Sequence, residues 1–121
     1  MRRYQKVGGE CPVQEFLDEQ RASNPDGYAA LIAGIRKLRD RKYHRPPLSE
    51  RVDDQIFELK ALPFRLFYAF RPGKLIVLLS GLRKKSRKLP EGEVKLARRY
   101  LEDYEQRCGH DEERTDEDFD K

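Results

Sequence analysis

Three strand-like segments follow one another between residues 55 and 80, and the gaps between them are very short. Residues 55–61 and 64–71 follow a two-residue alternation, which is typical of strands. Residues 74–80 are nearly all apolar, which predicts a central strand covered on much of both faces. Connections as short as these join antiparallel neighbours, so the three segments are expected to pair in sequence order.

Two helices are expected before these strands. Pro12 suits the first position of a short helix that runs to about Ala22. Residues 23–26 then supply a capping side chain, a proline and an acidic residue, which together start a second helix. Apolar side chains recur at three- and four-residue steps from there to Leu38, so this helix has one buried stripe.

A third helix is expected after the strands, beginning near Glu91. Residues 1–9 are a candidate edge strand, and the two prolines after Arg45 predict a loop to about Asp54. This order of elements predicts an α+β fold. We expect two layers, with the helices on one face of a small antiparallel sheet and the opposite face open to water.

Charge is distributed unevenly along the 121 residues, which together carry a net charge of +4. Residues 108–121 contain seven acidic and two basic side chains, and subtracting their −5 leaves +9 on residues 1–107. We therefore expect one basic domain over residues 1–107 and a disordered acidic tail over residues 108–121, which either screens the basic surface or adds solubility. A domain this basic favours an anionic partner, and nucleic acid is preferred because no basic amphipathic helix with aromatic anchors occurs.

Several other classes of protein are disfavoured. No run of 18 apolar residues could span a membrane, and no apolar signal core follows the N-terminus, so a cytoplasmic location is expected. Cys11 and Cys108 are expected to be reduced thiols. His44 and His110 lack the Cys/His cluster of a structural zinc site, so neither a metal nor another cofactor is expected.

A cluster of cations is expected at one end of the sheet. Lys60 and Arg65 lie on neighbouring strands, and the third strand leads into five bases within residues 83–88. If the strands pair as expected, these cations converge on the uncovered face and bind phosphates with a steep salt dependence. Other interpretations remain open: a solvated basic loop, a solvent-facing Lys60, and an Arg65 paired with Glu58 across the hairpin.

The order and spacing of five segments resemble the phage-derived HigB branch of the RelE superfamily of toxins. They are residues 56–60, 64–68, 75–82, 83–90 and 97–100, and the resemblance covers about residues 12–105. It implies a toxin of a type II toxin–antitoxin system with a RelE-like fold. Such toxins are ribosome-associated endoribonucleases that cut mRNA, and a helix-turn-helix antitoxin (HigA-like) neutralises them.

The resemblance also transfers roles to particular residues. Lys60 stands where the family usually has arginine, and Arg65, Lys84, Lys85 and Lys88 match family positions directly. The sequence departs from some relatives that place catalytic His and Tyr near the C-terminus. Here Tyr100 and Tyr104 lie in the last helix and His110 lies in the tail, so no acid–base residue is identified.

A metal-independent mechanism follows from these roles, in which the 2′-hydroxyl of RNA attacks the adjacent phosphorus. The expected catalytic residues are Lys60, Arg65, Lys84 and Lys85, which would stabilise the phosphate, with Lys60 an alternative base. The expected RNA-binding residues are Arg83, Arg87 and Lys88. Two rival functions remain: a non-catalytic RNA- or ribosome-binding module, and a phage regulatory protein that acts through protein contacts.

Overall fold

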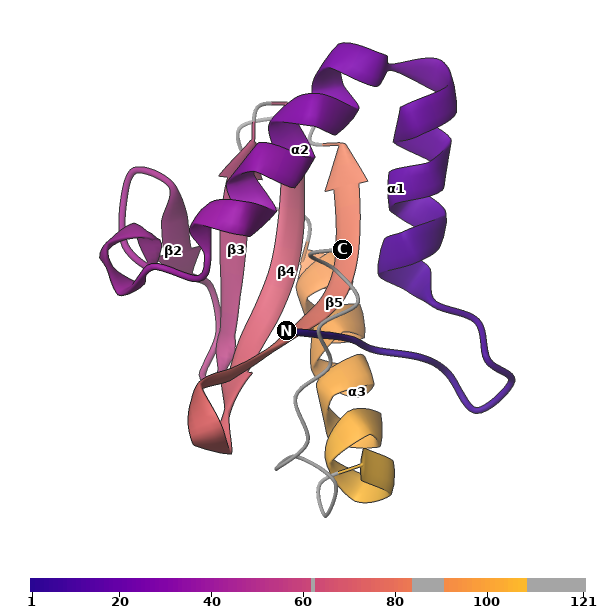
Figure 1. The fold of residues 1–121 in the computed structure, drawn as a ribbon. Helices are drawn as coiled ribbons and strands as arrows, with labels where there is room; N and C mark the ends of the chain where they lie inside the picture. The colour runs from indigo at the N-terminus through magenta and orange to yellow at the C-terminus, as the bar shows by residue number, and fades with distance from the viewer. Residues whose placement is uncertain (62, 84–90, 109–121) are drawn as a thin grey trace.

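The computed structural model describes residues 1–61, 63–83 and 91–108 (Figure 1). Ten elements follow one another within these ranges. They are β1 (Arg2–Arg3), α1 (Pro12–Ser23), α2 (Pro25–Lys37), the 3-10 turn η1 (Arg41–Tyr43), β2 (Ser49–Arg51), β3 (Ile56–Ala61), β4 (Phe64–Arg71), the 3-10 turn η2 (Pro72–Lys74), β5 (Leu75–Arg83) and α3 (Glu91–Cys108). The expected acidic tail and the basic run after Arg83 lie outside the described residues, apart from Cys108 at the end of α3.

The sheet has five strands in the order β1-β5-β4-β3-β2. The antiparallel pairing of β3, β4 and β5 in sequence order is confirmed. The candidate edge strand is also confirmed as β1, which pairs parallel to β5 and makes the sheet mixed. The opposite edge is β2, which lies where we expected a loop. Its short sequence, Ser49–Arg51, has no apolar alternation, and it is held as a strand by backbone pairing with β3.

The α+β class is confirmed, but the helices cover both faces of the sheet (Figure 1). Side chains of α1 and α2 pack with one set of alternating strand residues, which includes Leu66 and Leu78. Side chains of α3 pack with the other set, which includes Phe67 and Val77. The single covered face that we expected is therefore replaced by a sheet between two helical layers. The reason is that β4 and β5 are apolar in both alternations, so each face needs a cover.

The start of α2 shows how local sequence and packing agree. The side chain of Asn24 accepts a hydrogen bond of 3.1 Å from the backbone N–H of Gly27, which confirms the expected cap. A Cβ atom on Gly27 would lie only 2.4 Å from the ring of Phe64 in β4. Glycine at this position therefore allows α2 to approach the sheet closely.

The N-terminal segment is joined to α3 by polar contacts. The hydroxyl of Tyr4 donates a hydrogen bond of 2.6 Å to Oδ2 of Asp103, and its ring stacks on Tyr100 with centroids 4.7 Å apart. Burial and the adjacent Asp103 carboxylate raise the pKa of Tyr4 to about 12. Within the described ranges, the helices lack the combination of length and apolar character needed to cross a membrane.

Candidate nucleic-acid interface

Lys60 and Arg65 lie directly opposite each other near the end of the β3–β4 hairpin. Residues paired in this way project from the same face of a sheet, so the structure brings these two predicted site residues together. Alternation along β3 places Lys60 on the face that also carries Ile56 and α3. The β3–β4 pairing that we inferred from the sequence is what produces this arrangement.

Two carboxylates accompany these cations. The Nζ atom of Lys60 lies 2.7 Å from Oε2 of Glu50 and 4.0 Å from Oε1 of Glu58. The Nε atom of Arg65 lies 3.7 Å from Oε2 of Glu58, which is the cross-strand pair that the sequence left open. We call Glu50, Glu58, Lys60 and Arg65 the hairpin cluster. Its two positive and two negative charges cancel, so the expected crowding of cations around Lys60 is not found among these described residues.

Burial separates the members of the hairpin cluster. Arg65 is only 7% exposed and Glu58 only 3%, whereas the side chains of Lys60 and Glu50 are 28% and 51% exposed. Arg65 also donates a hydrogen bond of 3.0 Å from a terminal guanidinium nitrogen to the carbonyl of Phe64. We expected Arg65 on a wet face, but it is buried on the face of the sheet that also carries Phe67 and α3. Lys60 and Glu50 are thus the solvent-accessible members.

The structure does not bring Arg83 into the hairpin cluster. Arg83 pairs with Phe64, whose side chain packs beneath α1 and α2, whereas Leu82 is the residue opposite Arg65. Arg83 therefore lies on the face of the sheet opposite to Arg65, at the exposed end of β5. The remaining predicted site residues, Lys84, Lys85, Arg87 and Lys88, lie outside the described residues.

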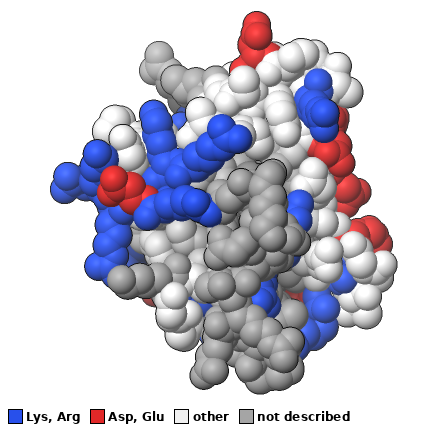
Figure 2. All heavy atoms as spheres, viewed as in Figure 1, with Lys and Arg blue, Asp and Glu red and all other residues white. Residues whose placement is uncertain are grey.

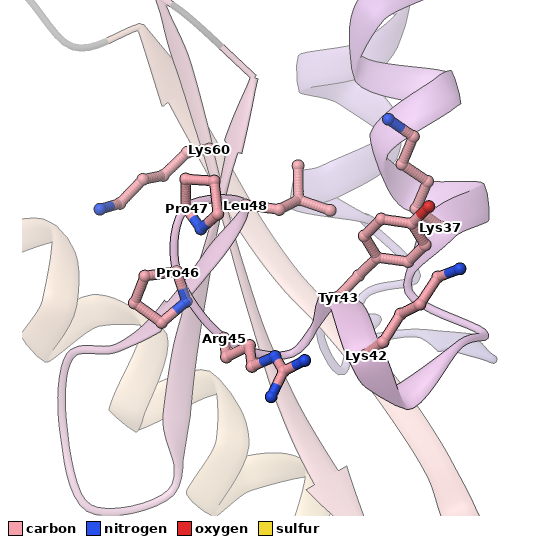
Figure 3. Close-up of a pocket in the computed structure, with 8 residues that line it drawn as sticks. All are labelled: Lys37, Lys42, Tyr43, Arg45, Pro46, Pro47, Leu48 and Lys60. Atoms are coloured by element: carbon pink, nitrogen blue, oxygen red, sulfur yellow. The ribbon is translucent and has the colours of Figure 1, made fainter.

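A second cationic feature lies beside the hairpin cluster, and we call it the basic groove. It is a pocket of about 560 Å³ lined by Lys37, Lys42, Tyr43, Arg45, Pro46, Pro47, Leu48 and Lys60 (Figure 3). In Figure 2, Lys and Arg side chains gather on the left of the view, which is the side where β2 lies in Figure 1. A small group of Asp or Glu atoms lies among them. Lys60 belongs to both features, so the basic groove adjoins the hairpin cluster at this residue.

The end of α2, η1 and the segment before β2 position the groove residues. Lys37 ends α2, Lys42 and Tyr43 belong to η1, and the prolines terminate the helical path. The backbone N–H of Lys60 donates a hydrogen bond of 2.8 Å to the carbonyl of Leu48, which attaches this segment to β3. Figure 3 shows Lys60 extending away from Lys37, Lys42 and Tyr43, on the other side of the prolines.

Sequence reasoning missed four groove residues: Lys37, Lys42, Tyr43 and Arg45. A signal was present, because residues 36–45 contain six Lys or Arg side chains together with a tyrosine. We interpreted them separately, as the polar face of a helix and a loop. The tertiary structure turns the chain so that both parts line one groove with Lys60.

His44 lies next to the groove but is held in the fold. Its Nδ1 is 2.8 Å from the hydroxyl of Tyr68, and its Nε2 is 2.5 Å from the carbonyl of Leu38. Burial lowers the pKa of His44, and burial also raises the pKa of Tyr68 to about 12. At neutral pH both side chains are therefore uncharged, and both ring nitrogens of His44 have partners.

Comparison with known proteins identifies a family. Residues 17–102 match the family model described as "Phage derived protein Gp49-like (DUF891)", which is more than half of the chain. No curated protein matches the chain. The matched range includes α2, all of β2 to β5 and most of α3, and with them every described residue of the hairpin cluster and the basic groove. The chain belongs to the Gp49-like family of phage-derived proteins, a family associated with RelE-like toxins.

Proposed function

We propose that this protein is the toxin of a type II toxin–antitoxin system, of the HigB branch of the RelE superfamily, and cuts mRNA without a metal ion. The observation that carries the proposal is the placement of Lys60. This residue lies opposite Arg65 in the hairpin cluster and also lines the basic groove. An RNA strand bound in the groove would therefore pass the hairpin cluster. Membership in a phage-derived family associated with RelE-like toxins supports the same conclusion.

The proposed reaction is an internal transfer at phosphorus. The 2′-oxygen of one nucleotide attacks the adjacent phosphorus, its proton passes to a base, and the bond to the 5′-oxygen of the next nucleotide breaks. The products are a 2′,3′-cyclic phosphate and a 5′-oxyanion, which takes a proton from water and becomes a 5′-hydroxyl. Fixed positive charge accelerates such a step because negative charge builds on the phosphate in the transition state.

The residues of the hairpin cluster suit different parts of this reaction. Lys60 is accessible and would stabilise the phosphate directly, while the buried Arg65 adds positive charge from below and holds Glu58. Glu50 is half-exposed and lies 2.7 Å from the Lys60 ammonium, so it is positioned to accept the proton of the 2′-hydroxyl. Lys84 and Lys85 remain proposed phosphate ligands, and Arg83, Arg87 and Lys88 proposed contacts to flanking RNA.

The partners follow from the proposed activity. The substrate is mRNA on the ribosome, the location is the cytoplasm, and a helix-turn-helix antitoxin keeps the protein inactive. A test is inducible expression in a bacterial host, with growth and mRNA cleavage sites measured in the presence and absence of the neighbouring gene. We expect growth arrest and new mRNA ends, both of which the neighbouring gene suppresses if it encodes the antitoxin.

Single substitutions test the assigned residues. We expect Lys60→Ala and Arg65→Ala to abolish growth arrest, whereas Arg21→Ala on the exposed surface of α1 should leave it intact. Each purified variant is checked for cooperative unfolding, because Arg65 is buried. A folded Arg65→Ala variant that remained fully toxic would refute its assignment, and a folded wild-type protein that neither arrests growth nor cuts mRNA would refute the toxin function.

One observation favours a second candidate, a non-catalytic RNA- or ribosome-binding module. His44 is the one histidine in the described ranges, and both of its ring nitrogens are engaged within the fold. General acid–base catalysis in the hairpin cluster then depends on carboxylates and lysine. A passive binder would retain RNA affinity while producing no new mRNA ends in the expression experiment.

A further inference from the structure

We infer that the basic groove is a binding site for single-stranded RNA, in which a base lies against Tyr43 and the adjacent phosphates contact Lys37, Lys42 and Arg45. This inference deepens the proposed function, on which it rests for the identity of the natural ligand. It assigns a binding role to a part of the molecule that shares only Lys60 with the hairpin cluster. It also predicts which way the RNA strand continues.

The charge of the groove suits a polyanion. Of the eight described residues that line it, four are cations and none is acidic. Lys42 has an exposed partner in Asp40, with Nζ and Oδ2 3.7 Å apart, and Lys60 has Glu50. Ion pairs between exposed side chains contribute little to stability, so the Lys42–Asp40 pair can give way to a phosphate at low cost.

The other four lining residues give the groove an apolar surface, which identifies the ligand more closely. Tyr43, Pro46, Pro47 and Leu48 lie together between the cations (Figure 3). A nucleotide combines a flat apolar base with a charged phosphate, and so matches both parts of this lining. An acidic peptide would use the cations but leave the apolar surface without a partner.

The ring of Tyr43 is the proposed stacking surface. It is only partly buried, and the Nζ atoms of Lys37 and Lys42 lie 5.5 and 5.1 Å from its centroid. Both ammonium groups lie over the ring as cation–π partners. Proteins bind single-stranded nucleic acid with aromatic rings set in a positively charged groove, because a base can stack while its phosphate is neutralised. Bases in a duplex are already paired and stacked, so the groove should discriminate against double-stranded RNA.

The groove is organised before any ligand binds. The two prolines restrict the backbone, and the backbone N–H of Ser49 donates a hydrogen bond of 3.1 Å to the carbonyl of Arg45. His44 adds contacts to Leu38 and Tyr68 on either side of its ring. A binding surface that is already ordered loses less conformational entropy on binding, which favours affinity.

Lys60 sets the direction of the bound strand. It lines the groove on the far side of the prolines from Tyr43 and lies opposite Arg65 in the hairpin cluster (Figure 3). RNA seated on Tyr43 would therefore run past Lys60 toward Arg65. Groove substitutions are expected to weaken RNA binding, whereas hairpin-cluster substitutions are expected to slow cleavage of RNA that is already bound.

The first test measures the salt dependence of binding. The full-length protein is titrated against a short fluorescent uridine oligonucleotide, and anisotropy gives Kd at several salt concentrations. Lys37→Gln/Lys42→Gln is compared with Arg21→Gln/Lys95→Gln, which removes two exposed cations on α1 and α3. Loss of two phosphate contacts should reduce the slope of log K against log salt by about 1.4, while the control keeps the wild-type slope. Equal slopes for the two double variants would overturn the inference.

The second test examines stacking. Tyr43→Leu keeps an apolar side chain but loses the aromatic face, and we expect it to weaken oligonucleotide binding by about 5- to 150-fold. Tyr43→Phe should bind like the wild type. Wild-type affinity in Tyr43→Leu would contradict the inference, as would a glutamate-rich peptide that competes with the oligonucleotide at comparable concentration.

Failure of this inference can be distinguished from failure of the proposed function. If Arg65→Ala abolishes toxicity while the groove variants keep full RNA affinity and full toxicity, the toxin function stands and the groove assignment is wrong. If the wild type neither arrests growth nor cuts mRNA, but Tyr43→Leu still weakens binding of single-stranded RNA, the groove assignment stands and the toxin function is wrong.

Discussion

The hydroxyl of Tyr68 donates a hydrogen bond of 2.8 Å to Nδ1 of His44 and so joins the middle strand of the sheet to the segment that lines the basic groove. The direction of this bond follows from the other ring nitrogen. The carbonyl of Leu38 can only accept, so Nε2 of His44 carries the hydrogen and Nδ1 of the neutral ring is the acceptor. The His44 ring also contacts Phe70 edge-on, with centroids 4.7 Å apart. His44 is therefore a structural anchor of the groove.

The first prediction concerns pH. Burial lowers the pKa of His44 from its ordinary value near 6.5, so the unfolded chain takes up this proton more readily than the folded one. The contribution of neutral His44 to the free energy of unfolding is therefore complete above about pH 6.5. It is lost as the pH falls toward the lowered pKa that His44 has in the folded protein. Urea unfolding at about pH 7.5 and about pH 5.5 should show a larger loss of stability in the wild type than in His44→Gln. Equal losses would show that His44 is not the titrating group.

The second prediction concerns the donor of the same bond. Tyr68 is fully buried, so Tyr68→Phe removes a hydroxyl and leaves Nδ1 of His44 without its partner. We expect the free energy of unfolding to fall by about 1–2 kcal/mol. Tyr28→Phe is the matched control, because Tyr28 is only partly buried on α2, and its unfolding midpoint in urea should stay close to the wild type. A Tyr68→Phe protein as stable as this control would contradict the assigned bond.

The third prediction concerns the buried pair in the hairpin cluster. Glu58→Gln removes the carboxylate beside Arg65, which is 7% exposed, and leaves its charge buried. We expect a loss of about 3–5 kcal/mol in the free energy of unfolding. The double variant Glu58→Leu/Arg65→Met removes both charges and should recover much of that stability while remaining unable to arrest growth. A double variant less stable than Glu58→Gln would argue against this pair as the source of the loss.

The fourth prediction tests the second helical layer. Leu101 on α3 is 3% exposed and packs against the face of the sheet that we expected to be open to water. Leu101→Ala should destabilise the protein by about 2–5 kcal/mol, because it leaves a cavity between α3 and the sheet. Val7→Ala is the control, since Val7 is 80% exposed. Similar unfolding midpoints for the two variants would mean that α3 contributes little to the core.

Patterns of residues close together in the sequence were sufficient to predict much of the fold. The pairing of β3 with β4 and of β4 with β5 followed from periodicity and from connections too short for any other arrangement. The cap of α2 followed from Asn24 and Pro25. The contact between Glu58 and Arg65 was one of the interpretations that the predicted hairpin left open, and the structure contains it. In each case the interacting groups are close in sequence, so local sequence determines the geometry.

Prediction from the sequence failed where a strand has no side-chain pattern of its own and where distant segments pack together. Nothing in Ser49–Arg51 marks a strand, because β2 exists only through its backbone bonds to β3. Arg65 looked accessible because the sequence predicted an uncovered face, whereas α3 covers that face of the sheet and Arg65 is buried.

The sequence by itself determined the α+β class, the three-stranded meander, most helix positions and the facing pair of Lys60 and Arg65. Tertiary structure decided that α3 covers the second face of the sheet, that Arg65 is buried with Glu58, and that Lys37, Lys42, Tyr43 and Arg45 line one groove with Lys60. The physical reason is that periodicity and turn chemistry act over a few residues. Burial and the meeting of separate segments depend on which surfaces pack together once the whole chain has folded.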